Sequence, residues 1–212
     1  MLVEKMQKSA CEQANESLKK LMAGHERFLS NRLSGPNRSP DRREEVAEVQ
    51  NPHTVMVTCA DSRMSPELIF DQGFGDIFAI RVAGNVLDRV ATAGIEFASA
   101  VLGTPLLVVL GHHRCAAVER AVVTHAGTAP ASTENIDALV EEIRPSVEAT
   151  CELGGDHLEN TIRHNVERVI AKMFDQSPLL ADRVRNGELG VMTAIFDMTT
   201  GELEIGRWHT PE

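Results

Sequence analysis

Four short apolar runs, separated by segments that suit helices, are the feature that most constrains the fold of this chain. The runs cover residues 54–58, 77–82, 106–110 and 191–196. The third is apolar throughout, which is typical of a strand buried on both faces of a sheet. Strands that alternate with helices form a mostly parallel sheet with helices on both faces. We therefore predict an α/β fold with four such strands, and an antiparallel edge strand at 202–205 that follows a turn at 199–201.

The remaining segments predict helices and a single domain. Helices are expected at 91–102, 115–124, 134–152, 157–174 and 178–186. Residues 4–33 suit an N-terminal helix with an apolar stripe, which ends at Ser34-Gly35-Pro36-Asn37 before a polar loop that runs to Glu48. A length of 212 residues fits one domain over 1–212. We divide it into an N-terminal helical arm at 1–35 and an α/β core at 50–212.

Charge and cysteine usage exclude several classes of partner. The 21 basic and 31 acidic residues give a net charge of −10, which argues against nucleic acid or a membrane surface as a partner. No apolar run reaches the ~18–20 residues of a membrane span. The N-terminus lacks the basic and apolar regions of a signal peptide. The four cysteines, at positions 11, 59, 115 and 151, show no disulfide spacing. These features favour a reducing, cytoplasmic compartment.

Two cysteines and a histidine follow two of the predicted strands. Cys59 comes directly after the first strand, and His112 comes two residues after the end of the third. Cys115 lies three residues beyond His112, so both side chains can share one face at the start of a helix. In parallel sheets ligands bind at the carboxyl ends of the strands. Two thiolates and one imidazole suit Zn²⁺ and leave a fourth position open, as in a catalytic zinc site.

Asp61 and Arg63 stand beside the first cysteine and can complete such a site. Asp61 can accept a hydrogen bond from the group in the fourth position, or it can itself bind the zinc and block the site. Arg63 can decide between these roles by holding Asp61 in a bidentate pair. The opposing interpretation is a non-catalytic zinc or redox module in which protein side chains fill all four positions, with His113 as a candidate for the fourth.

The same segments resemble the β-class carbonic anhydrases, which interconvert carbon dioxide and bicarbonate. The resemblance runs from about Gln50 to Val118, through the stretches 59–63, 73–85, 94–98 and 111–117. It implies Zn²⁺ as the cofactor, Cys59, His112 and Cys115 as its ligands, and Asp61 with Arg63 as the catalytic pair. It also implies a homodimer or a multiple of it, with the N-terminal helix on the partner. A related zinc hydrolase of CS₂ or COS is the alternative within the same fold.

The resemblance also implies a substrate pocket and shows three departures. Gln50 matches a glutamine that contacts substrate in the plant-like members, and Phe78 matches an apolar pocket residue. We add Gly84 and Phe97 to this pocket, although Phe97 stands where those members usually carry tyrosine. Ala116 replaces the usual glycine after the second cysteine, where a methyl group could crowd the site.

The third departure is His113, which stands where serine or aspartate is usual. A histidine titrates near neutral pH, so His113 is a candidate proton shuttle from the metal site to buffer. The alternative is a side chain that packs or forms hydrogen bonds locally.

Overall fold

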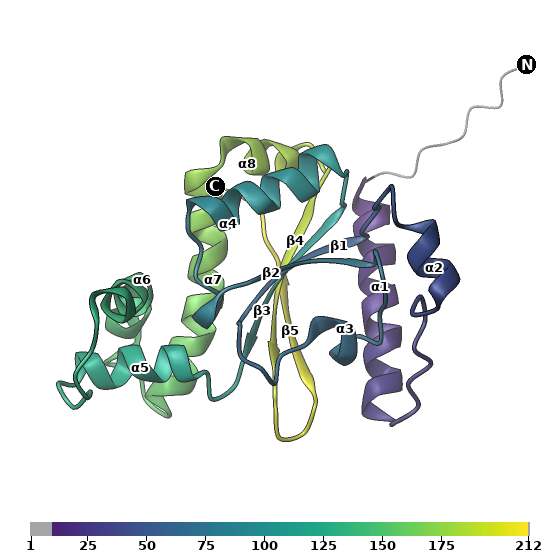
Figure 1. Cartoon of the computed structure of the whole chain (residues 1–212). Helices are drawn as coiled ribbons and strands as arrows, with labels where there is room; N and C mark the ends of the chain where they lie inside the picture. The colour runs from purple at the N-terminus through teal and green to yellow at the C-terminus, as the bar shows by residue number, and fades with distance from the viewer. Residues whose placement is uncertain (1–9, 212) are drawn as a thin grey trace, which may run out of the picture.

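A five-stranded sheet, in the order β2-β1-β3-β4-β5, divides the protein into two layers of helices (Figure 1). The computed structural model describes residues 10–211. The strands are β1 (Thr54–Thr58), β2 (Ile77–Arg81), β3 (Leu106–His112), β4 (Gly190–Phe196) and β5 (Leu203–Trp208). The first four are parallel, and β5 runs antiparallel to β4. The predicted α/β fold is therefore confirmed, including its antiparallel edge strand.

One face of the sheet is covered by the helices from the middle and end of the chain. These are α4 (Arg89–Glu96), the π-helical turn η2 (Phe97–Val101), α5 (Ala116–His125), α6 (Glu134–Thr150), α7 (His157–Gln176) and α8 (Pro178–Arg185). Their apolar side chains share one core with alternate residues of the strands, such as Val57 of β1 and Val109 of β3. The strand β3 is buried along its whole length, as its sequence predicts.

The N-terminal helix α1 (Ala10–Leu29) covers the opposite face, together with α3 (Pro66–Ile69) (Figure 1). Its residues Ala14 and Leu21 are buried in a second core, and Leu18 and Phe28 pack against that core. Much of the apolar stripe is therefore buried on the chain's own sheet, whereas Leu29 is 46% exposed; the contact of this helix with a partner stays a prediction. The part of the predicted helix before Ala10 lies outside the described residues.

A buried carboxylate ties α1 to this layer. Asp71 is fully buried and accepts hydrogen bonds from Arg27 Nε at 2.6 Å and from the backbone N–H groups of Ser34 and Gly35, each at 3.0 Å. Burial alone opposes ionisation, but these hydrogen bonds outweigh it and hold the pKa of Asp71 well below its usual range. The anionic carboxylate thus fixes the end of α1 against the sheet.

Three short elements do not appear among the predicted ones. Residues predicted as a polar loop contain α2 (Pro40–Glu45), which Ser39 caps by accepting a hydrogen bond from Arg42 N at 3.1 Å. The Ser39-Pro40 pair is a helix-start signal that predicts such a turn. The elements α3 and η1 (Ala83–Asn85) are too short to show an apolar period. No helix in the described part of the chain is long and apolar enough to cross a bilayer.

Candidate metal centre

Cys59, His112 and Cys115 meet at the carboxyl ends of β1 and β3. Their potential ligand atoms all lie within 4.8 Å of one another, and the two Sγ atoms are 3.8 Å apart. All three residues are buried. Among residues 10–211, no other histidine, cysteine, aspartate or glutamate joins this group. The group therefore offers three ligands and leaves a fourth position open.

The ring of His112 is oriented to present one nitrogen to the two sulfurs. Its Nδ1 lies 2.9 Å from the carbonyl oxygen of His113, to which it donates a hydrogen bond. Its Nε2 is buried and has no hydrogen-bond partner within the described residues. Other buried histidine nitrogens of the described residues, such as His25 Nε2, also lack a partner, but this one lies beside two cysteine sulfurs, a donor set that suits a metal ion. The residues present therefore fit Zn²⁺.

The contact between the two sulfurs shifts the pKa values of both cysteines, in opposite directions. The Cys115 contact is the main cause that lowers the pKa of Cys59 to about 4, and the backbone N–H groups of Asp61 and Gly84 act in the same direction. The pKa of Cys115 is raised, first by Cys59 and then by burial. One thiolate therefore forms readily and opposes the second. A divalent cation would relieve this repulsion and stabilise both thiolates.

Gly84, predicted as a pocket residue, lies in η1 and donates a hydrogen bond from its N–H to Cys59 Sγ at 3.3 Å. Its φ of +62° favours glycine, and an added Cβ would lie 2.9 Å from Ile143 Cδ1. Its carbonyl accepts a hydrogen bond from Asn165 Nδ2 of α7 at 2.9 Å. Gly84 thus supports a metal ligand directly. The sequence gives no sign of Asn165, because it comes 81 residues later.

Asp61 and Arg63 form the predicted bidentate pair beside the triad. Arg63 donates from Nε to Oδ1 at 2.9 Å and from Nη2 to Oδ2 at 2.7 Å, and its backbone N–H also reaches Oδ1 at 2.9 Å. These bonds lower the pKa of Asp61 to about 2, so the carboxylate stays charged. Asp61 Oδ2 lies 3.9 Å from His112 Nε2. The Asp61 carboxylate therefore lies next to the metal position, but both of its oxygens accept hydrogen bonds from Arg63.

Arg81 is a further member of the site that the sequence pattern alone did not single out. It donates from Nη2 to the carbonyl of Asp61 at 2.7 Å and from Nε to the carbonyl of Cys59 at 3.2 Å. These two bonds hold the loop that carries the first ligand and the acidic residue. Its position gives a signal that could have found it, because it is the last residue of β2, at the same edge of the sheet.

His113 and Ala116 lie beside the ligands without entering the triad. His113 Nδ1 donates a hydrogen bond to Glu159 Oε2 of α7, so its ring is turned away from the sulfurs. This contact favours the local role over the proton shuttle, and it removes His113 as a fourth ligand in this structure. Ala116 is exposed in the first turn of α5, so its methyl group does not crowd the buried site.

The other predicted pocket residues lie at the opposite end of the sheet within this chain. Gln50 precedes β1, and Phe78 pairs with Val55 near the start of that strand. Cys59 is four residues beyond Val55, or ~13 Å along the strand. Phe97 is 45% exposed, and its ring centroid lies 6.3 Å from that of Phe78. The structure therefore groups the two phenylalanines with each other but not with the triad of the same chain.

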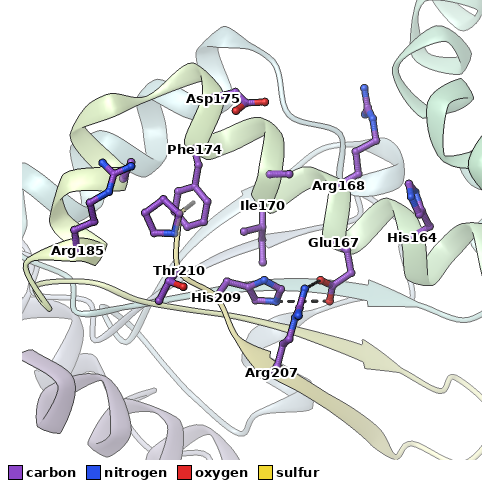
Figure 2. Close-up of a pocket in the computed structure, with 13 residues that line it drawn as sticks. His164, Glu167, Arg168, Ile170, Phe174, Asp175, Arg185, Arg207, His209 and Thr210 are labelled. Atoms are coloured by element: carbon purple, nitrogen blue, oxygen red, sulfur yellow. Dashed lines mark ion pairs between the residues drawn. The ribbon is translucent and has the colours of Figure 1, made fainter.

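A cavity of about 630 Å³ lies between α7, α8 and the residues after β5 (Figure 2). Glu167 accepts a hydrogen bond from Thr193 Oγ1 at 3.1 Å and lies 3.6 Å from His209 Nε2 and 3.5 Å from Arg207 Nη2. The neighbouring Trp208 pairs with Met192, whereas His112 pairs with Phe196. This cavity is thus toward the other end of β4 and contributes nothing to the triad.

The parallel sheet, the Cys₂His group at its strand ends and the open fourth position define a zinc enzyme of the α/β class. Comparison with known proteins specifies the family. The carbonic anhydrase family model matches residues 54–203. Carbonic anhydrase 2 of Mycobacterium tuberculosis is 36% identical over 184 residues, which cover 86% of this chain and 88% of that protein. The carbonic anhydrase of Mycolicibacterium smegmatis is 30% identical over 88% and 90% of the two chains.

Solved structures agree on the fold. A β-carbonic anhydrase of Coccomyxa superposes with a TM-score of 0.70 at 21% identity, over 94% of this chain and 86% of that one. One of the tetrameric β-carbonic anhydrases of Sordaria macrospora also gives 0.70, at 23% identity, over 92% and 97% of the two chains. The chain belongs to the carbonic anhydrase family, and its fold is that of the β class. The predictions of family, enzyme class and zinc cofactor are thereby confirmed.

Proposed function

We propose that this chain hydrates carbon dioxide reversibly to bicarbonate and a proton at the Cys59–His112–Cys115 centre. The observation that carries the proposal is the buried, unpartnered His112 Nε2, which lies beside the sulfurs of Cys59 and Cys115 and 3.9 Å from Asp61 Oδ2. When bound there, zinc supplies the Lewis acidity that makes water a nucleophile near neutral pH.

The Asp61–Arg63 pair keeps the fourth position accessible. Arg63 engages both carboxylate oxygens, so Asp61 stays charged and is restrained from becoming a fourth ligand. From this position Asp61 accepts a hydrogen bond from a water molecule near the triad and fixes the orientation of that water. Arg81 holds the carbonyls of Cys59 and Asp61, so the whole loop keeps this geometry.

A second copy of the chain completes the substrate pocket. Within residues 10–211, strand β2 is an edge of the sheet, and beside it α4 and η2 expose Val90, Phe97 and Val101 by 78%, 45% and 68%. An exposed apolar surface beside an open edge favours a partner. A two-fold axis at this edge would bring the start of β2 in one copy beside the end of β2 in the other. Gln50, Phe78 and Phe97 of one copy would then reach the metal centre of its partner.

The remaining proposals concern environment. Among the described residues, Cys59, Cys115 and Cys151 form no disulfide, which supports a reducing, cytoplasmic location. The net charge of −10 supports small molecules and a second copy of the chain as partners, rather than nucleic acid or a membrane.

The proposed activity is tested by stopped-flow CO₂ hydration with the wild-type chain and Asp61→Asn. The variant should keep its zinc, because Asp61 is not a ligand, but should lose most of its turnover because an amide cannot replace the clamped anion. Product from COS and CS₂ is measured on the same samples. Turnover of those gases without CO₂ hydration would contradict the proposal in favour of the related hydrolase.

A further inference from the structure

The segment that carries two of the three ligands is held from outside the metal centre by one glutamate. Glu159, in the first turn of α7, accepts hydrogen bonds from His113 Nδ1 at Oε2 and from the backbone N–H of Arg114 at Oε1, the latter at 3.2 Å. Glu159 is therefore bonded to both residues that lie between the ligands His112 and Cys115.

This stretch needs support because its backbone is unusual. Arg114 has a φ of +54°, in the left-handed region that non-glycine residues rarely adopt. Such a conformation persists where surrounding contacts fix it. The turn at Arg114 leads directly into Cys115, the N-cap of α5, so its geometry decides where the second sulfur points. Glu159 binds the N–H at this turn and thus holds it in place.

Glu159 also acts on His112 indirectly, through the peptide group between His113 and Arg114. The carbonyl of His113 accepts the hydrogen bond from His112 Nδ1 that leaves Nε2 free for a metal. The backbone N–H of His113 donates to the carbonyl of Phe196 on β4 at 3.0 Å. The carbonyl of His113 and the N–H of Arg114 belong to one planar peptide group, so this carbonyl cannot rotate away from His112 without breaking the hydrogen bond from Arg114 to Glu159.

Glu159 is itself well placed to give this support. Its backbone N–H is bonded to Asp156 Oδ1, the N-cap of α7, at 3.2 Å, and its side chain is only 24% exposed. The next turns of α7 pack in the core through Ile162 and Val166. The carboxylate therefore projects from a rigid element and not from a loop.

We propose that Glu159 is a positioning residue for the metal centre, which orients His112 through the carbonyl of His113 and Cys115 through the turn at Arg114. The inference rests on the proposed function only in taking this triad as the zinc site. It gives the uncommon His113 a structural role, in which its ring connects the ligand segment to α7.

The test compares Glu159→Ala with a matched control, Glu134→Ala. Glu134 is an exposed glutamate in the first turn of α6, so its removal also takes one acidic side chain from a helix start. Zinc affinity is measured by competition with a chromogenic chelator. The visible spectrum of the Co²⁺-substituted protein reports the ligand geometry. Circular dichroism confirms that the samples are folded.

We expect Glu159→Ala to weaken zinc binding about 10- to 100-fold and to shift the Co²⁺ bands, as loss of a group that orients metal ligands does. Glu134→Ala should change neither. His113→Ala keeps the bond from Arg114 and should give an intermediate loss. The double variant of Glu159 and His113 should bind zinc no more weakly than Glu159→Ala alone, because both changes remove the same hydrogen bond between His113 and Glu159.

Zinc affinity within about twofold of wild type, together with unchanged Co²⁺ bands in Glu159→Ala, would overturn the inference. If that variant does not fold, Glu159→Gln and His113→Ala decide the question by the same two measurements. Failure of the proposed function looks different: the wild-type chain would bind zinc without hydrating CO₂, and the metal-binding results for Glu159 would still stand.

Discussion

Gly84→Ala should lower both the free energy of unfolding and the affinity of the site for zinc. Gly84 has a φ of +62°, and a Cβ built there lies 2.9 Å from Ile143 Cδ1 and 3.2 Å from Ala117 Cβ. Both distances are shorter than ordinary van der Waals contact. Ile143 is fully buried, so its side chain has little room to move.

Two costs therefore add at this position. The left-handed backbone costs a non-glycine residue ~1–2 kcal/mol. The crowding against a packed core costs ~1–3 kcal/mol more. Gly84→Ala should thus lower the free energy of unfolding by ~2–5 kcal/mol in the metal-free protein. Because the N–H of Gly84 is bonded to Cys59 Sγ, any shift of this turn also moves a ligand, and zinc affinity should fall at least ~10-fold.

Gly103→Ala provides the matched control. Gly103 has a φ of +71°, but a Cβ there meets no heavy atom of the described residues within 4 Å. Backbone strain should lower the free energy of unfolding of this variant by only ~1–2 kcal/mol, and the variant should bind zinc like the wild type. Urea unfolding in the presence of a chelator, followed by zinc titration, measures both quantities. Equal destabilisation and equal zinc affinity of the two variants would refute the reasoning about Gly84.

Three further predictions follow from the described contacts. Arg63→Ala should raise the pKa of Asp61 from about 2 and free its carboxylate to bind the metal, so zinc content should stay constant while CO₂ turnover falls ~10²-fold or more. Asp71→Asn should lower the free energy of unfolding by ~1.5–3 kcal/mol at pH 7. Because folding lowers the pKa of Asp71, this difference should shrink as the pH falls below ~5; a constant difference would contradict it. Val90→Asp should shift sedimentation toward the monomer and reduce turnover, whereas Leu153→Asp, 56% exposed on the turn after α6, should do neither.

The metal ligands could be predicted from the sequence because three simple rules converge on them. Apolar runs locate the strands, parallel sheets bind ligands at the strand ends, and Cys59 and His112 stand at two such ends. The i, i+3 spacing of His112 and Cys115 also indicates a pair, but the predicted helical face is wrong: His112 ends β3, Cys115 is the N-cap of α5, and the turn at Arg114 brings the two side chains together. The same rules would have included Arg81, which ends the neighbouring strand. The bidentate Asp61–Arg63 pair is also local, since the two residues are separated by one position.

The supports of the site could not be predicted in this way. Asn165 and Glu159 reach the centre from α7, and only the packing of that helix on β3 and β4 brings them there. No sequence period indicates such contacts. The burial of α1 on its own sheet was missed for a related reason: an apolar stripe predicts that a surface is buried but not against which chain.

The most direct test of the catalytic centre is CO₂ hydration by stopped flow in three preparations of the same chain: as purified, after removal of the metal, and after zinc is restored, each with its zinc content measured. We expect about one zinc per chain, loss of hydration with the metal, and full recovery on its return. Cys115→Ser, treated identically, should regain neither zinc nor activity. Full CO₂ hydration by the metal-free chain would contradict the assignment of the Cys59–His112–Cys115 centre as the catalytic site.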